Sequence, residues 1–108
     1  MMSLTQLSLH PLALGPSGQG SALGSRARAV GLRRQVEAAL EEGSKVVLDF
    51  DGVQATQSFV DELIGVVVLE RGPDVLRQVS FKRCSTDMKA IVSFVVSDRA
   101  KQHLASLA

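Results

Sequence analysis

Apolar and polar residues alternate near the N-terminus, which predicts a strand. The alternation covers residues 6–10 and has the period of two that is typical of a strand with one buried face. Pro11 follows and cannot donate to a strand ladder, so this strand is expected to lie at a sheet edge or to bend at Pro11. The alternation resumes at Leu12 and Leu14 and then gives way to a glycine-rich segment, residues 15–20, which predicts a hairpin loop.

Two segments have the 3.6-residue period of amphipathic helices. The first is expected to start after an N-cap at Ser25 and to end at Gly43. The other begins at Ser85 or Thr86 and continues toward the C-terminus. Their apolar faces are Ala29, Leu32, Val36, Ala39 and Leu40 in the first, and Met88, Ile91, Val92 and Val95 in the second.

A further helix is expected between these two, from Ser58 to Arg71. Its first turn, with Ser58 and Asp61, resembles a capping box, and its many apolar residues indicate burial on much of the circumference. Residues 66–68 are three valines, which would also suit a strand. Gly65, in mid-helix, costs about 1 kcal/mol relative to alanine, which indicates close packing of the helix against a strand.

Two short apolar runs predict the remaining strands. Residues 45–50 are expected to form a central strand covered on both faces and followed by a turn at Asp51 and Gly52. Residues 79–82 form the last strand. The order β-(β)-α-β-α-β-α indicates an α/β fold with a small mixed sheet and helices packed against it, and residues 1–108 are interpreted as a single domain.

Composition narrows the range of functions. The chain has 108 residues, a formal net charge of +1 and four phenylalanines as its aromatic residues, a composition that argues against nucleic-acid binding. One cysteine and two histidines form neither a disulfide nor a metal-ligand pattern, so no metal or cofactor is expected. The first 25 residues are uncharged but lack the pattern of a signal peptide, so a cytoplasmic protein without membrane contact is expected.

An apolar strand followed by Asp49 and Asp51 also occurs in a class of enzymes. Haloacid-dehalogenase-type phosphotransferases present a nucleophilic and an acid/base aspartate beside Mg²⁺ in this way. That chemistry also needs a lysine and a late pair of acidic residues, which the sequence does not supply in the expected pattern. A Mg-dependent aspartyl phosphotransferase is therefore a remote alternative, and the two aspartates are interpreted as strand-end and turn residues.

Residues 46–65, VVLDFDGVQATQSFVDELIG, resemble the core of the STAS fold, the domain of bacterial anti-sigma factor antagonists. More narrowly, they are similar to a STAS-like family of uncharacterised bacterial proteins. The resemblance implies a non-enzymatic regulatory domain that binds a partner protein. It rests on Asp49, Phe50, Gly52, Val53, Ser58, Phe59, Asp61, Glu62, Leu63 and Gly65, together with Ser25 and Arg26 at the start of the first helix.

In anti-sigma factor antagonists, the serine at the position of Ser58 is phosphorylated by a partner with a histidine-kinase-type ATPase fold. Antagonists have an aspartate before this serine and a small residue after it, where this chain has Gln57 and Phe59. The resemblance implies Ser58 as the candidate phosphoacceptor, and a plain helix cap is the competing interpretation. It also implies a partner-binding surface formed by Gly52, Val53, Gln57, Ser58, Phe59, Asp61, Glu62 and Arg26.

Other interpretations stay open at this point. A small-molecule or nucleotide-sensing domain could hold an anionic ligand between the loop from Gly15 to Gly20 and the side chains of Arg26 and Arg28. Lys82 and Arg83 precede Cys84 and would lower the pKa of its thiol, and His103 is expected at the surface. The sequence leaves open whether the chain forms a homo-oligomer.

Overall fold

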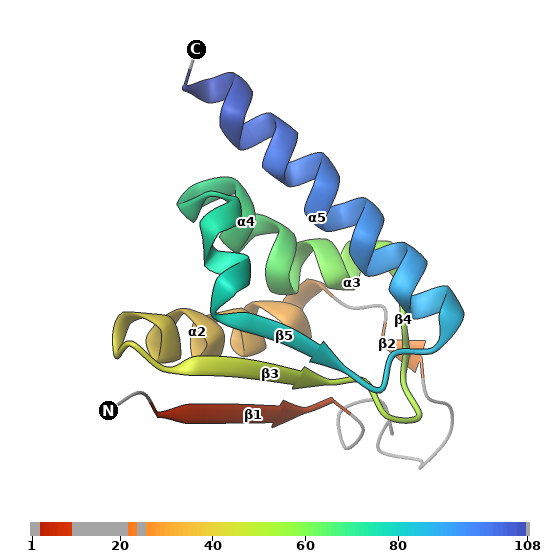
Figure 1. Ribbon diagram of the computed structural model, residues 1–108. Coiled ribbons are helices and arrows are strands. Elements are labelled where there is room, and N and C mark those ends of the chain that lie inside the picture. Colours follow the sequence, from red (N-terminus) through yellow and green to blue (C-terminus); the bar gives the residue numbers. More distant parts are fainter. Residues whose placement is uncertain (1–2, 10–21, 24–25, 108) are drawn as a thin grey trace.

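The computed structural model describes residues 3–9, 22–23 and 26–107. Three strands form the main sheet in the order β1-β3-β5 (Figure 1): β1 (Leu4–Ser8), β3 (Lys45–Asp49) and β5 (Val79–Lys82). Among the described strands, β1 lies at an edge and β3 in the centre, as predicted. The described strands of this sheet pair in parallel, so the sheet is parallel over these residues rather than mixed. Parallel neighbours need a long crossover connection, and helical segments supply it after β1 and after β3.

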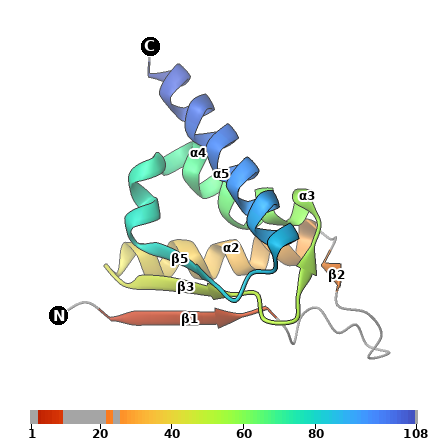
Figure 2. The same cartoon turned by 45° about the vertical axis from the view of Figure 1, so that its right-hand side comes forward.

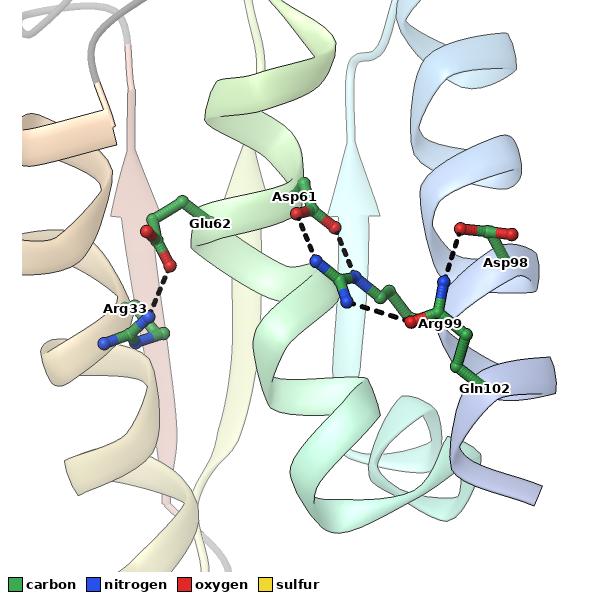
Figure 3. A network of polar contacts seen from close by, with 6 residues as sticks. All are labelled: Arg33, Asp61, Glu62, Asp98, Arg99 and Gln102. Carbon is green, nitrogen blue, oxygen red and sulfur yellow. Dashed lines mark hydrogen bonds and ion pairs between the residues drawn. The ribbon is translucent and has the colours of Figure 1, made fainter. Parts of the chain in front are cut away.

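The sheet buries one of its faces. Leu48 of β3 is fully buried, whereas the preceding Val47 is half-buried. Val47 lies in register between Gln6 of β1 and Ser80 of β5, and both of these side chains are exposed. The helices gather in front of the opposite face, as Figure 3 shows. The prediction that residues 45–50 are covered on both faces is therefore wrong.

Helices α2 (Arg26–Glu41) and α5 (Thr86–Ser106) form where the apolar period predicted them. Gly43, with φ of 81°, follows α2 in the left-handed conformation that glycine adopts without strain. Ser85 caps α5 by accepting a hydrogen bond from the N–H of Met88 at 3.1 Å. No helix of the described residues is both long and apolar enough to span a membrane. The predicted apolar faces are buried, with Ile91 only half-buried: Ala29, Leu32, Val36, Ala39, Leu40, Met88, Val92 and Val95.

The helix predicted between α2 and α5, which we call the middle helix, runs from Gln57 to Arg71 and contains a π-helical turn. The N–H of Val66 donates to the carbonyl oxygen of Asp61, five residues earlier, so the helix is locally wider. The three valines of residues 66–68 are helical, which confirms that prediction. A short 3-10 segment that was not predicted then leads toward β5. The middle helix consists of α3 (Gln57–Val60), the π turn η1 (Asp61–Gly65) and α4 (Val66–Arg71). The 3-10 segment is η2 (Pro73–Arg77).

Gly65 lies where the middle helix meets α5. A Cβ atom at this position would lie 2.9 Å from Cγ1 of Val95 and would also press against the carboxylate of Asp61. The predicted close packing is therefore present, but its partner is a helix and not a strand. The reason is that the π turn lies between α2 and α5, as Figure 3 shows, and contacts both.

A second sheet of two short strands was not predicted, because two residues carry no period. β2 (Ala22–Leu23) pairs in parallel with β4 (Gln54–Ala55), which follows the turn at Gly52 (Figure 2). That turn was predicted, and Gly52 adopts φ of 68° in it. Several predictions fall outside the described residues, namely those on Pro11, Leu12, Leu14, the loop of residues 15–20 and the cap at Ser25.

Candidate functional site

The segment after β3 presents two kinds of side chain. Gly52, Gln57 and Ser58 are exposed, whereas Val53 and Phe59 are buried in the core. Phe59 has no solvent exposure at all, so it is a core anchor. Of the residues predicted in this segment to bind a partner, Gly52, Gln57 and Ser58 are therefore accessible, whereas Val53 and Phe59 are not.

Thr56, rather than Ser58, caps the middle helix. Its backbone is extended (φ −73°, ψ 160°), and its Oγ1 accepts a hydrogen bond from the N–H of Phe59 at 3.2 Å. The predicted capping box of Ser58 and Asp61 is therefore wrong. Thr56 directly follows β4 and already has the extended backbone that a cap requires. Ser58 is the second residue of α3, and its exposed hydroxyl is not needed to hold the helix end.

Asp61 is bound by an arginine of α5. Arg99 donates to both of its oxygens, from Nε to Oδ1 at 2.7 Å and from Nη2 to Oδ2 at 2.6 Å (Figure 3). Nη1 of Arg99 also donates to Oε1 of Gln102 at 3.0 Å, and Nε2 of Gln102 donates to Oδ2 of Asp98 at 2.9 Å. The pair is mostly buried, with side-chain exposures of 15% for Asp61 and 24% for Arg99. The hydrogen bonds to Asp61 raise the pKa of Arg99, so this guanidinium stays charged.

Glu62, the next residue, contacts the other flanking helix. Arg33 of α2 donates from Nη1 to Oε2 of Glu62 at 2.5 Å. Its Nε also lies 3.7 Å from Oε1 of Glu37, one turn further along α2. Two consecutive acidic residues thus join the π turn to both of its neighbours, Asp61 to α5 and Glu62 to α2 (Figure 3). Arg33 therefore has a structural role within the arginine-rich start of α2. Arg26 begins that helix, and its side chain lies outside the described part.

Ser58 opens onto a polar hollow of about 460 Å³ between the start of the middle helix and α5. Its lining includes one cationic side chain, Arg99, and two carboxylates, Asp61 and Asp98. Sequence reasoning missed Arg99, because 38 residues separate it from Asp61 and no local pattern connects them. The complete lining is Gln57, Ser58, Asp61, Asp98, Arg99 and Gln102.

Asp49 is a buried carboxylate at the end of β3, only 2% exposed. Arg83 donates to both of its oxygens, with Nε 3.2 Å from Oδ1, and the N–H of Asp51 donates to Oδ1 at 3.0 Å. The hydrogen bonds from Arg83 hold the pKa of Asp49 below its usual value, although burial acts in the opposite direction. A nucleophilic aspartate needs an oxygen directed at a substrate. Because Arg83 donates to both oxygens of Asp49, these contacts support the interpretation of Asp49 as a strand-end residue.

Replacing Arg83 by glutamine is expected to shift acid unfolding to higher pH. The pKa of Asp49 is lowered in the folded state, so its ionised form stabilises the fold above the ordinary carboxyl pKa, and this contribution is lost as the pH falls through the lowered value. Without Arg83, burial raises that pKa, and protonation begins at a higher pH. The measurement is circular dichroism along an acid titration. Arg77→Gln, at an exposed arginine of η2, is the control, and equal midpoints for the two variants would contradict the expectation.

Two predicted side chains differ from expectation. Burial raises the pKa of the Cys84 thiol and outweighs the nearby charge of Lys89, so the predicted lowering by Lys82 and Arg83 is wrong. His103 is half-buried rather than at the surface, and its Nδ1 lies 2.7 Å from the carbonyl oxygen of Leu69 in α4.

Comparison with known proteins identifies one family. A model of a family described as a STAS-like domain of unknown function (DUF4325) matches residues 29–89, which is more than half of the chain. The match extends from α2 to the first turn of α5 and includes Ser58, Asp61 and Glu62, whereas Arg99 lies beyond it. No curated protein and no solved structure matches the chain significantly. Among the described residues, no cluster of three or more His, Cys, Asp or Glu side chains could hold a metal ion.

Proposed function

Because the chain belongs to this family of STAS-like domains, as its resemblance over residues 46–65 indicated, we propose that it is a non-catalytic regulatory module that binds a partner protein and that phosphorylation of Ser58 controls the binding. The partner proposed from the resemblance is a protein with a histidine-kinase-type ATPase fold. The observation that carries the proposal is the exposed Ser58 hydroxyl, which Thr56 frees from any capping role.

The polar hollow beside Ser58 supports a charge switch. A phosphate adds a charge of about −1.5 to −2 near neutral pH and brings strong acceptor oxygens. Asp61 and Asp98 repel such a group, while Arg99 attracts it. A phosphate at Ser58 therefore competes with Asp61 for Arg99, and the surface that a partner meets changes in both charge and contour. The residues proposed to contact the partner are Gln57 and Ser58, which line this hollow, and Gly52, which is exposed in the turn before β4.

The switch is tested with Ser58→Asp and Ser58→Ala in affinity purifications from the native cell extract, with partners identified by mass spectrometry. The expected result is that a protein with an ATPase fold copurifies with Ser58→Ala and is lost with Ser58→Asp. Because Thr56 provides the cap, Ser58→Ala should leave the free energy of unfolding within about 0.5 kcal/mol of the wild type.

The matched control is Thr86→Asp, which places the same charge on the first turn of a different helix, at an exposed residue of α5. This variant should retain the partner. Retention of the same partner by Ser58→Asp, or its equal loss from Thr86→Asp, would contradict a switch at Ser58. Phosphopeptide mapping of the native protein provides a second readout, since the proposal requires the modification at Ser58.

A further inference from the structure

An apolar hollow lies between the edge strand β5 and helix α5. Figures 1 and 2 show α5 starting beside the end of β5 and then running away from the sheet. The hollow lined by side chains of these two elements and of η2 has a volume of about 640 Å³, within the range typical of small-molecule sites. We call it the β5–α5 hollow, and its lining is Leu76, Val79, Phe81, Arg83, Cys84, Lys89, Val92, Ser93 and Val96.

The apolar walls of the β5–α5 hollow are incompletely covered. Leu76, Phe81 and Val96 pack against the core but are only partly buried. They come from η2, β5 and α5, so three separate elements contribute apolar surface to one concavity. β5 is an edge strand among the described residues, and no further described strand covers this side. An apolar ligand that displaces water from these side chains would bury apolar surface, which lowers the free energy.

The charged side chains of the lining are both cations. Arg83 is engaged by Asp49, which accepts two hydrogen bonds from it. Lys89 is exposed and forms no ion pair within the described part of the chain, and its charge acts on the thiol of Cys84 inside the same hollow. The hollow thus combines an apolar body with one uncommitted positive charge at its rim.

We propose that the β5–α5 hollow binds a small amphipathic carboxylate. Its hydrocarbon part lies against Leu76, Phe81 and Val96, and its carboxylate pairs with the ammonium group of Lys89. One lysine and one neighbouring hydroxyl, Ser93, suit a carboxylate better than a phosphate, which calls for more donors. Ser58 takes no part in this site, so binding should be the same in Ser58→Asp and Ser58→Ala.

Decanoate, below its micelle-forming concentration, is the probe for the full chain. Two measured quantities should change with decanoate concentration and then level off. The melting temperature should rise, and iodoacetamide should alkylate Cys84 more slowly. Cys84 is the single cysteine of the chain and lines this hollow, but it also lines a neighbouring one with Gly52 and Ser85, so variants must show which of the two decanoate occupies. Decanol has the same chain without the charge and should protect Cys84 much less. Equal protection by decanol would overturn the proposed role of Lys89.

Variants locate the binding. Lys89→Gln should weaken decanoate binding about tenfold or more, the loss expected for one hydrogen bond between charged groups. Ser93→Phe, at an exposed position of the lining, should fill the hollow and abolish protection. Lys101→Gln, at an exposed lysine of α5 outside the lining, is the matched control and should bind as the wild type does. Equal affinity of the two lysine variants would overturn the proposal. Protection that rises with protein concentration without decanoate would overturn it in favour of a second copy of the chain.

Discussion

Gly65→Ala is expected to destabilise the protein by about 2–3 kcal/mol, the upper part of the range of about 1–3 kcal/mol that is typical of overpacking a buried position. The backbone at Gly65 is helical (φ −59°, ψ −44°), so alanine on its own would be the better helix residue by about 1 kcal/mol. The added Cβ would lie 2.9 Å from Val95 Cγ1 and against a carboxylate oxygen of Asp61. Val95 is buried and Asp61 is held by Arg99, so neither neighbour yields without breaking a contact. Chemical denaturation measures the loss.

Gly31→Ala is the matched control for this experiment. Gly31 also lies inside a helix, α2, but it is exposed, and nothing lies within 4 Å of a Cβ built there. The same substitution should therefore stabilise the protein by about 1 kcal/mol. Opposite signs at the two positions would separate crowding from helix propensity. A stabilising effect at Gly65 would contradict the close approach of the π turn to α5.

The regular elements could be predicted because their signals are local. The apolar residues of α2, α5 and β3 recur with the correct period, and Gly43 and Ser85 end and begin helices in the usual way. Thr56 and Ser58 are both acceptable caps by residue type, so sequence could not choose between them. The choice depends on β4, a two-residue strand that extends the backbone just before Thr56.

The candidate site could be predicted only in part, because its charges are paired across long separations. The family match covers Ser58 and Asp61, which the resemblance over residues 46–65 had already indicated. The partner of Asp61 is 38 residues away, and that of Glu62 is 29 residues away. These two consecutive acids lie in the π turn and contact different helices, α5 and α2, and no local sequence pattern predicted that turn. Sequence therefore indicated the segment, while the geometry supplied Arg99 and Arg33.

Arg99→Gln is expected to destabilise the protein by about 2–3 kcal/mol, because a mostly buried carboxylate loses two charge-assisted hydrogen bonds. Asp61→Asn should cost a similar amount, and the double variant should lose clearly less than the sum of the two single variants. Chemical denaturation of the four proteins completes the cycle. Lys101→Gln, on the exposed side of α5, is the control and should change stability by less than about 0.5 kcal/mol. Additive losses would show that Arg99 acts through packing rather than through Asp61.

The same cycle connects stability to the proposed switch. If a negative charge at Ser58 competes with Asp61 for Arg99, then Ser58→Asp should alter the stability of the wild type and of Arg99→Gln by different amounts. Two residues that share a hydrogen-bonding partner typically show coupling of about 0.5 kcal/mol or more. Thr86→Asp carries its charge on another helix end, away from the lining of the polar hollow, and should show no coupling to Arg99→Gln. Equal coupling for Ser58→Asp and Thr86→Asp would remove Arg99 from the switch, while a partner effect at Ser58 could still be measured on its own.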